Sequence, residues 1–360
     1  MWKILIFNVL FCAVNCDLDC KYQVHTDFGP EDCDSEAGNY YNPTMYDGCI
    51  PGCEKRMKIT DLSGLYKCSS LHLCPPGYEC KEEKCVLDED SCFKYVYKTG
   101  DYENARFQPK CLVDGTWAPK QCKGDRCFCY GPKGNRIFGD AFLNQASNMT
   151  CACSRKRAEM EEAKQYFFVS LHCDSMGNYE PLQCQEGNCW CVEPKTGELT
   201  APVVPELMMS QLPCYDSESV GSQYFRQCES QIYAQAKIKD EYNAHGTIKI
   251  NFGNLKCLYD GNFGPYKTEE GQTMCVWKDN SKIGSYAVAG ENPTLTCNCA
   301  RDVKIFELLG KQLMQACSPD GSYSPVQKDG DEYYCVDTDG YRKNDPGEEP
   351  LEEQFCRDLI

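Results

Sequence analysis

The sequence predicts a small, disulfide-rich fold repeated along the chain rather than one large domain. Three observations support this: 30 of the 360 residues are cysteine, the cysteines recur at fixed spacing, and a glycine–aromatic–proline motif recurs with them. Small secreted domains bury little apolar surface and gain stability from disulfides, at about 2–4 kcal/mol each. We therefore expect an oxidised, extracellular protein.

Residues 1–16 have the plan of a secretory signal peptide. Lys3 precedes an apolar run from Ile4 to Val14. The run is too short for a bilayer, which needs about 20 apolar residues. Cleavage after Cys16 removes Cys12 and Cys16 from the total of 30 and leaves 28, an even number that allows every cysteine to pair.

The cysteines after residue 90 define four modules. Six cysteines of the first module are separated by 19, 11, 5, 2 and 22 residues, and six of the second by 20, 11, 5, 2 and 23. The third and fourth modules keep four of the six. The predicted boundaries are 17–91 for an N-terminal cysteine-rich module, 92–152 for module 1, 153–214 for module 2, 215–227 for a linker, 228–298 for module 3 and 299–356 for module 4.

A glycine, an aromatic residue and a proline, each two residues apart, follow the second cysteine of every module. An aspartate directly precedes three of the glycines, so we expect a turn with positive φ at each glycine. A short aromatic strand should leave the turn, and the proline should end it or restrict it to a sheet edge. The residues are Gly115, Trp117 and Pro119; Gly177, Tyr179 and Pro181; Gly261, Phe263 and Pro265; and Gly321, Tyr323 and Pro325.

The third and fourth cysteines are missing together from modules 3 and 4. Thr268 and Thr273 occupy their positions in module 3, and Lys328 and Tyr333 in module 4. If these cysteines were bonded to different partners, their joint loss would leave two other thiols unpaired. The pattern therefore predicts the disulfides Cys122–Cys127 and Cys184–Cys189.

Two segments have helical character. Residues 155–165 are rich in alanine, glutamate, lysine and arginine, which favour helices. Residues 303–314 place Val303, Phe306, Leu309, Leu313 and Met314 on one apolar stripe, which we expect to lie in a core.

One stretch of module 2 carries a family resemblance. Residues 177–184 (GNYEPLQC), followed by Cys189-Trp190-Cys191-Val192 and Gly197, resemble the signature of the thyroglobulin type-1 domain. Module 1 matches with Cys127-Phe128-Cys129-Tyr130, and modules 3 and 4 resemble divergent members. The resemblance covers residues 92–356 and implies a short helix leading into a small antiparallel sheet.

The resemblance also implies the remaining disulfides after residue 90, in which the first cysteine pairs with the second and the fifth with the sixth. The implied pairs are Cys92–Cys111, Cys129–Cys151, Cys153–Cys173, Cys191–Cys214, Cys228–Cys257, Cys275–Cys297, Cys299–Cys317 and Cys335–Cys356. The pairing of the eight cysteines in residues 17–91 stays open.

Some thyroglobulin type-1 domains, the thyropins, inhibit papain-like cysteine proteases by inserting rigid loops into the active-site cleft, and others bind or space extracellular partners. By resemblance, the inserted segments precede the second cysteine, join the third and fourth cysteines, and follow the fifth. In module 1 they are Ala105, Arg106, Phe107, Gln108 and Pro109; Lys123, Gly124, Asp125 and Arg126; and residues 131–135. In module 2 they are Phe167, Phe168, Val169 and Ser170; Gln185, Glu186, Gly187 and Asn188; and residues 194–197.

The apolar members of these segments allow two interpretations. Phe107, Phe167, Phe168 and Val169 either form an exposed tip that contacts a protease or pack inside their own module. Only an exposed tip would favour inhibition. Modules 3 and 4 lack the central disulfide, so we expect residues 267–272 and 328–332 to be unbridged loops that do not inhibit.

The composition disfavours other functions. The chain has only four histidines and no nucleophile motif, so we expect no enzyme, and its cysteine spacing does not match a zinc site. We expect no cofactor. A formal charge of −17 disfavours nucleic acid and anionic membranes as partners. Asn148, in the sequence Asn-Met-Thr, is a predicted glycosylation site.

Two functions remain. The first is a secreted, thyropin-like, reversible and non-covalent inhibitor of papain-like cysteine proteases acting through modules 1 and 2. The alternative is an extracellular binding or matrix protein that uses the modules as spacers without inhibiting a protease.

Overall fold

The computed structural model describes residues 39–42, 48–51, 68, 74, 77–98, 107, 109–112, 114–164, 169–247, 252, 255–292 and 294–359. The predicted signal peptide, most of the N-terminal module, and Ala105, Arg106, Gln108, Phe167 and Phe168 lie outside the described residues. The chain divides into two compact units, residues 1–151 and 152–360, which are described separately.

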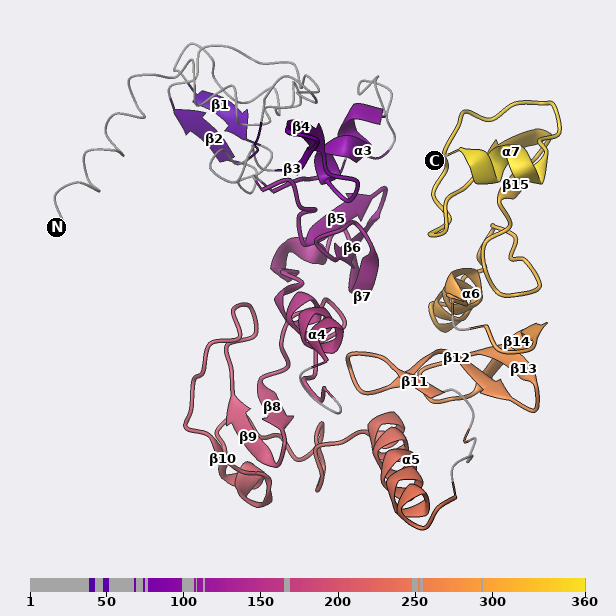
Figure 1. Ribbon diagram of the computed structural model, residues 1–360. Helices are drawn as coiled ribbons and strands as arrows, with labels where there is room; N and C mark the ends of the chain where they lie inside the picture. Colours follow the sequence, from indigo (N-terminus) through magenta and orange to yellow (C-terminus); the bar gives the residue numbers. More distant parts are fainter. Residues whose placement is uncertain are drawn as a thin grey trace, which may run out of the picture. The chain divides into compact units, whose positions relative to one another are not determined.

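The first unit contains three small antiparallel sheets in its described part (Figure 1). Module 1 consists of a helix, α3, followed by a three-stranded meander, β5-β6-β7, and then the short 3-10 helix η2. The elements are β1 Asn39–Asn42, β2 Gly48–Pro51, β3 Tyr78–Lys81, β4 Lys84–Leu87, α3 Cys92–Lys98, β5 Lys120–Lys123, β6 Arg126–Tyr130, β7 Arg136–Phe142 and η2 Ala146–Asn148.

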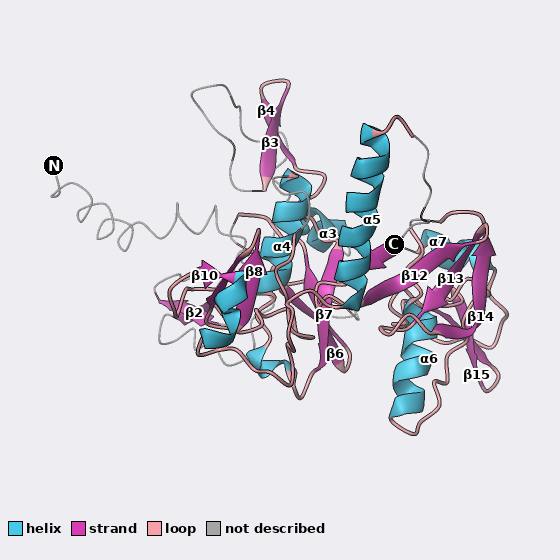
Figure 2. Ribbon diagram, turned by 90° about the horizontal axis from the view of Figure 1, so that it is seen from below, coloured by secondary structure: helices cyan, strands magenta, loops and turns pink. Residues whose placement is uncertain are grey.

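The second unit repeats the order of helix followed by antiparallel sheet three times. Figure 2 shows short strands joined by long loops, with α5 as a long helix. The elements are α4 Ala152–Ala163, β8 Leu182–Gln185, β9 Asn188–Cys191, β10 Val204–Pro205 and η3 Glu206–Gln211 in module 2; α5 Gln227–Ala244, β11 Leu255–Cys257, β12 Phe263–Glu269, β13 Gln272–Val276 and β14 Lys282–Ala289 in module 3; and α6 Asn298–Leu308, β15 Val326–Asp329, β16 Glu332–Cys335 and α7 Glu353–Asp358 in module 4.

Disulfides hold every module together. The structure pairs all twenty cysteines after residue 90 in the ten combinations that the gap pattern and the resemblance imply. The described part of the N-terminal module adds Cys68–Cys80 and Cys74–Cys85. The predicted fold class, small antiparallel sheets with short helices and many disulfides, is therefore confirmed.

The glycine of the repeated motif connects helix and sheet. Its φ lies between +73° and +85° in all four modules, a conformation that favours glycine. In modules 1, 2 and 4 its carbonyl accepts a hydrogen bond from a backbone N–H in or beside the first turn of the helix, at Cys92, Ser154 and Ala300. The predicted aromatic strand is a single bridge residue in these modules, and only in module 3 does it extend into a full strand, β12.

A buried glutamine fastens the second cysteine to the sheet in three modules. Gln121, Gln183 and Gln327 are each at most 2% exposed. Each glutamine side chain hydrogen-bonds the backbone N–H and the backbone carbonyl of the residue before the second cysteine. It also donates to the carbonyl three residues before itself, and all these bonds measure 2.7–2.9 Å. Module 3 has Lys267 at this position, and a strand pairing of β11 with β12 replaces the glutamine.

Polar pairs replace the missing disulfides of modules 3 and 4. Thr268 lies opposite Thr273, as Cys122 lies opposite Cys127, and the two hydroxyls hydrogen-bond over 3.0 Å. In module 4 the Lys328 ammonium lies 5.2 Å from the centre of the Tyr333 ring. Residues 267–272 and 328–332, which we expected to be unbridged loops, have no disulfide between their strands, but both segments are hairpins paired up to two-residue turns.

The two predicted helices form, with different bounds. α4 begins three residues before the predicted start. α6 ends at Leu308 because Gly310 adopts φ +66° and the N–H of Lys311 bonds the carbonyl of Phe306, a glycine-based helix ending. The predicted stripe is therefore only partly in a core: Leu313 packs against the core of module 4, whereas Leu309 is 54% and Met314 89% exposed. α6 lies against β13 and β14 instead (Figure 1).

Candidate functional site

The hairpin turns of modules 1 and 2 are short and doubly constrained. Gly124 and Asp125 form the turn between β5 and β6, and Glu186 and Gly187 form the turn between β8 and β9. All four residues are exposed. The disulfide between the third and fourth cysteines joins the two strands one residue pair behind each turn. Each turn is therefore an exposed tip whose backbone is already ordered before any partner binds.

The segment before the second cysteine lies beside this tip in both modules. In module 1, the Lys123 ammonium at the end of β5 lies 4.9 Å from the centre of the Phe107 ring. In module 2, Ser170 donates a backbone hydrogen bond of 2.9 Å to Oε1 of Gln185, the last residue of β8. The structure thus brings the first and second predicted segments together.

Several predicted contact side chains are nevertheless occupied within their own module. Lys123 is only 9% exposed, between the rings of Phe107 and Tyr130. Arg126 forms an ion pair with Asp140. Val169 is 5% exposed, so of its two interpretations the structure supports packing inside the module. These side chains stabilise the tip and do not form its exposed surface.

The third predicted segment lies at the opposite end of each sheet. Residues 131–135 connect β6 to β7 at Tyr130 and Arg136, whereas the tip connects β5 to β6 at Lys123 and Arg126. A five-residue strand separates the two ends, roughly 16 Å at about 3.3 Å per residue. Residues 194–197 of module 2 likewise follow the far end of β9. The structure therefore does not bring the third segment to the tip.

A different segment reaches the tip, and sequence analysis missed it. After the far turn the chain returns along the sheet and arrives beside the tip in both modules. The N–H of Leu143 bonds the carbonyl of Asp125 over 2.7 Å, and the N–H of Glu206 bonds the carbonyl of Gly187 over 2.8 Å. The sequence did contain a signal for this contact. In a sheet of consecutive antiparallel strands, every second connection lies at the same end, so the chain that follows the third strand must return to the tip.

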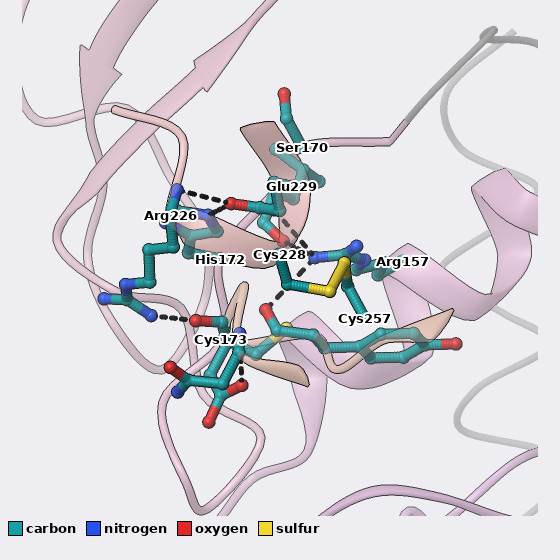
Figure 3. Close-up of polar contacts among 12 residues, drawn as sticks. Arg157, Ser170, His172, Cys173, Arg226, Cys228, Glu229 and Cys257 are labelled. Carbon is teal, nitrogen blue, oxygen red and sulfur yellow. Dashed lines mark hydrogen bonds and ion pairs between the residues drawn. A yellow bond between two sulfur atoms is a disulfide. The ribbon is translucent and has the colours of Figure 1, made fainter. Parts of the chain in front are cut away.

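A polar cluster joins module 2 to module 3 within the second unit: Arg157, His172 and Glu229 are buried in it, and Glu180 and Arg226 are half-buried. Figure 3 shows Glu229, from α5, between His172, Arg226 and Arg157. Its Oε2 lies 2.6 Å from Nε2 of His172 and accepts a hydrogen bond of 3.1 Å from the N–H of Arg226. Nδ1 of His172 lies 3.5 Å from Glu180, whose carboxylate pairs with the Arg226 guanidinium at 2.8 Å.

Arg157 completes the cluster from α4. Its guanidinium donates hydrogen bonds of 2.6 Å to the carbonyl of Leu171 and 3.1 Å to that of Tyr259, and it lies 4.0 Å from Oε1 of Glu229. Oε1 itself has no hydrogen-bond partner among the described residues. Arg157, His172 and Glu229 are each at most 2% exposed, so module 3 covers charges of module 2 that water would otherwise solvate.

The cluster shifts the pKa values of its members. Burial disfavours a charged His172, but hydrogen bonds and charges from Glu180 and Glu229 outweigh it and raise the pKa of His172. Burial also disfavours a charged Glu180, but His172 and Arg226 outweigh it and lower the pKa of Glu180. The ring of Tyr224 stacks on His172 with centroids 4.2 Å apart, and burial raises the pKa of its hydroxyl.

This packing changes the interpretation of residues 215–227 as a simple linker. Tyr224 is 3% exposed and donates a hydrogen bond of 2.8 Å to the carbonyl of Ser170. Arg226 bonds Glu180 of module 2 and also the carbonyl of Asp260 in module 3. The last residues of the segment therefore belong to the packed junction between the two modules.

The described residues offer one group of potential metal ligands, Cys68, Cys74 and Cys85, whose sulfur atoms lie within 4.8 Å of one another. All three are in disulfides, so none provides a thiolate. Asn148, the predicted glycosylation site, is exposed in η2. None of the described helices combines the length and apolar character that crossing a bilayer requires.

Comparisons with known proteins agree with the geometry of modules 1 and 2. The family model described as the thyroglobulin type-1 repeat matches residues 85–151 and 146–204. Thyroglobulin of Rattus norvegicus is 29% identical over 93 residues, which are 24% of this chain and 3% of thyroglobulin. The chain thus spans only a small part of the thyroglobulins that it matches.

Two shorter proteins match over larger shares of their own length. Equistatin of Actinia equina is 23% identical over 203 residues, which are 52% of this chain and 78% of equistatin. U20-hexatoxin-Hi1a of Hadronyche infensa is 29% identical over 104 residues, which are 27% of this chain and 69% of the toxin.

Proposed function

We propose that the chain is a secreted inhibitor of papain-like cysteine proteases, because the thyroglobulin type-1 repeat model matches residues 85–151 and 146–204 and some thyroglobulin type-1 domains, the thyropins, inhibit such proteases. Modules 1 and 2 are the inhibitory modules. Each inserts its hairpin tip, together with the segment before the second cysteine, into the active-site cleft. Binding is reversible and non-covalent.

The observation that carries this proposal is the rigid, exposed tip found in modules 1 and 2. The disulfides Cys122–Cys127 and Cys184–Cys189 close the hairpins directly behind the exposed turns. A loop that is already ordered loses little conformational entropy on binding, where each mobile side chain would cost about 0.5–1.5 kcal/mol. The bridge also keeps the two strands joined if the protease cleaves the turn.

The proposal is restricted to two modules for a physical reason. Modules 3 and 4 hold the same register with a hydroxyl pair, Thr268 and Thr273, and with Lys328 beside Tyr333. Such contacts are worth about 1 kcal/mol and do not keep a cleaved strand attached. We therefore expect these two modules to contribute stability and spacing rather than inhibition.

The test is inhibition of papain by the full-length chain. The chain is titrated into papain whose active sites have been counted, and residual activity is followed with a fluorogenic peptide. The proposal predicts an inhibition constant well below micromolar and full recovery of protease on dilution. Micromolar or weaker inhibition at low salt would contradict it.

A second function, an extracellular binding protein that uses the modules as spacers, is favoured by the junction of modules 2 and 3. The buried pair of His172 and Glu229 fixes one module against the next, as a rigid spacer requires. Under this alternative, papain activity stays unchanged while the chain keeps its disulfides and its junction.

A further inference from the structure

We propose that Leu143 and Leu207 are the apolar contact residues of the two tips, and that they determine how tightly modules 1 and 2 hold a protease. This inference rests on the proposed function. It assigns the apolar contact to side chains outside the three segments that the family resemblance implies.

Both leucines lie beside the turn of their tip. Leu143 directly follows β7, and its own N–H bonds the carbonyl of the turn residue Asp125. Leu207 follows Glu206, whose N–H bonds the carbonyl of the turn residue Gly187. Each leucine is therefore attached, directly or through one residue, to the backbone of the tip and enters any cleft that the tip enters.

Both leucines are also exposed. Leu143 is 54% and Leu207 99% exposed, whereas Val169, the predicted apolar contact of module 2, is 5% exposed. Leucines that pack inside module 2, such as Leu182, are nearly inaccessible. A leucine that lies almost wholly in water adds little to folding, but burying it in a partner removes its apolar surface from water and stabilises the complex.

Module 3 has no leucine at the equivalent positions. Its chain also returns to the tip, and the N–H of Gly290 bonds the carbonyl of Gly271 over 2.7 Å. Glycine occupies the place of Leu143, and the exposed Glu291 follows it where module 2 has Leu207. The same backbone arrangement therefore presents an apolar tip in modules 1 and 2 and a polar one in module 3.

The tips also indicate the chemistry of the partner. Each combines its leucine with an exposed carboxylate in the turn, Asp125 in module 1 and Glu186 in module 2. A complementary cleft has an apolar wall for the leucine and hydrogen-bond donors beside it for the carboxylate. We assign this partner as the substrate cleft of a papain-like protease.

The test compares four full-length variants as inhibitors of papain. Leu143→Asp and Leu207→Asp are made singly and together, and Leu309→Asp in module 4 is the matched control because Leu309 is also 54% exposed. The double variant should raise the inhibition constant at least tenfold, which corresponds to about 1.4 kcal/mol. Each single variant should weaken binding by its own module at least tenfold and leave binding by the other module unchanged, and the control should bind as the wild type does.

The outcomes separate this inference from the proposed function. If the wild-type chain inhibits and the double variant inhibits equally well, the leucines are not contacts, although the chain is still an inhibitor. If the wild-type chain does not inhibit, the proposed function and this inference fail together. The milder double variant Leu143→Ala with Leu207→Ala, together with intact disulfides by non-reducing peptide mapping, shows that weakened inhibition does not come from misfolding.

Discussion

The junction between modules 2 and 3 depends on His172, and replacing it by phenylalanine should open the junction. The variant keeps an aromatic ring against Tyr224 but removes the nitrogen that lies 2.6 Å from Glu229. Glu229 is fully buried, and its Oε1 already has no hydrogen-bond partner among the described residues. The substitution therefore leaves the buried Glu229 carboxylate with fewer hydrogen bonds and without a neighbouring positive charge from His172.

Removing one partner of a buried charged pair typically costs about 3–5 kcal/mol. Arg157 lies 4.0 Å from the same carboxylate and still offsets part of its charge. We therefore expect a loss of stability at the lower end of this range, about 3 kcal/mol. Since about 1.4 kcal/mol corresponds to a tenfold change, local opening of the junction should become roughly a hundredfold more frequent.

The junction should also depend on pH. The folded pKa of His172 is raised above its ordinary value of 6.5, so its contribution to stability is complete below pH 6.5 and is lost as pH rises through the raised pKa. The folded pKa of Glu180 is lowered below 4.5, so its contribution is present above pH 4.5 and is lost as pH falls through the lowered pKa. We therefore expect greatest stability in mildly acidic solution, between pH 4.5 and 6.5.

Hydrogen exchange of the full-length chain, followed by mass spectrometry, measures this opening. Peptides that cover residues 224–232 should exchange about a hundredfold faster in His172→Phe, and in the wild-type chain their corrected exchange should be slowest in mildly acidic solution. His245→Phe is the matched control, because His245 is exposed at the end of the same helix, α5. Equal exchange in the wild type and in His172→Phe at every pH would refute the reasoning.

Three further predictions concern the sheets. Replacing Cys122 and Cys127 by serine should remove about 2 kcal/mol of stability and weaken inhibition by module 1; an unchanged inhibition constant would show that the bridge is not needed. Placing cysteines at Thr268 and Thr273 should create a disulfide, visible as the loss of two hydrogens from the intact mass, without making module 3 inhibitory. Gln183→Leu should destabilise module 2 by about 2 kcal/mol or more, because it leaves the N–H of His172 and the carbonyl of Glu180 unbonded; an unchanged urea midpoint would contradict this.

The sequence predicts the modular architecture well because cysteine spacing is a direct record of covalent constraints. Modules 3 and 4 lack cysteines at both positions equivalent to Cys122 and Cys127, and this joint absence correctly predicted the Cys122–Cys127 disulfide. In module 3 a hydrogen bond between Thr268 and Thr273 takes the place of the disulfide. The glycine turns follow equally directly from the motif, because positive φ restricts the choice of residue.

The parts that sequence analysis missed depend on distances that no local pattern records. His172 and Glu229 are 57 residues apart and belong to different modules, so neither residue alone indicates the buried pair. The assignment of residues 131–135 to the tip overlooked the reversal of direction at β6. The prediction of a helix over residues 303–314 did not take account of Gly310, which ends the helix.

The central claim is that modules 1 and 2 each carry a complete protease-binding tip, and the number of papain molecules bound by one chain tests it most directly. Active-site titration at concentrations far above the inhibition constant, checked by light scattering of the purified complex, gives this number. The account predicts two protease molecules per chain. A chain that leaves every papain active site free, or that never binds more than one, would contradict it.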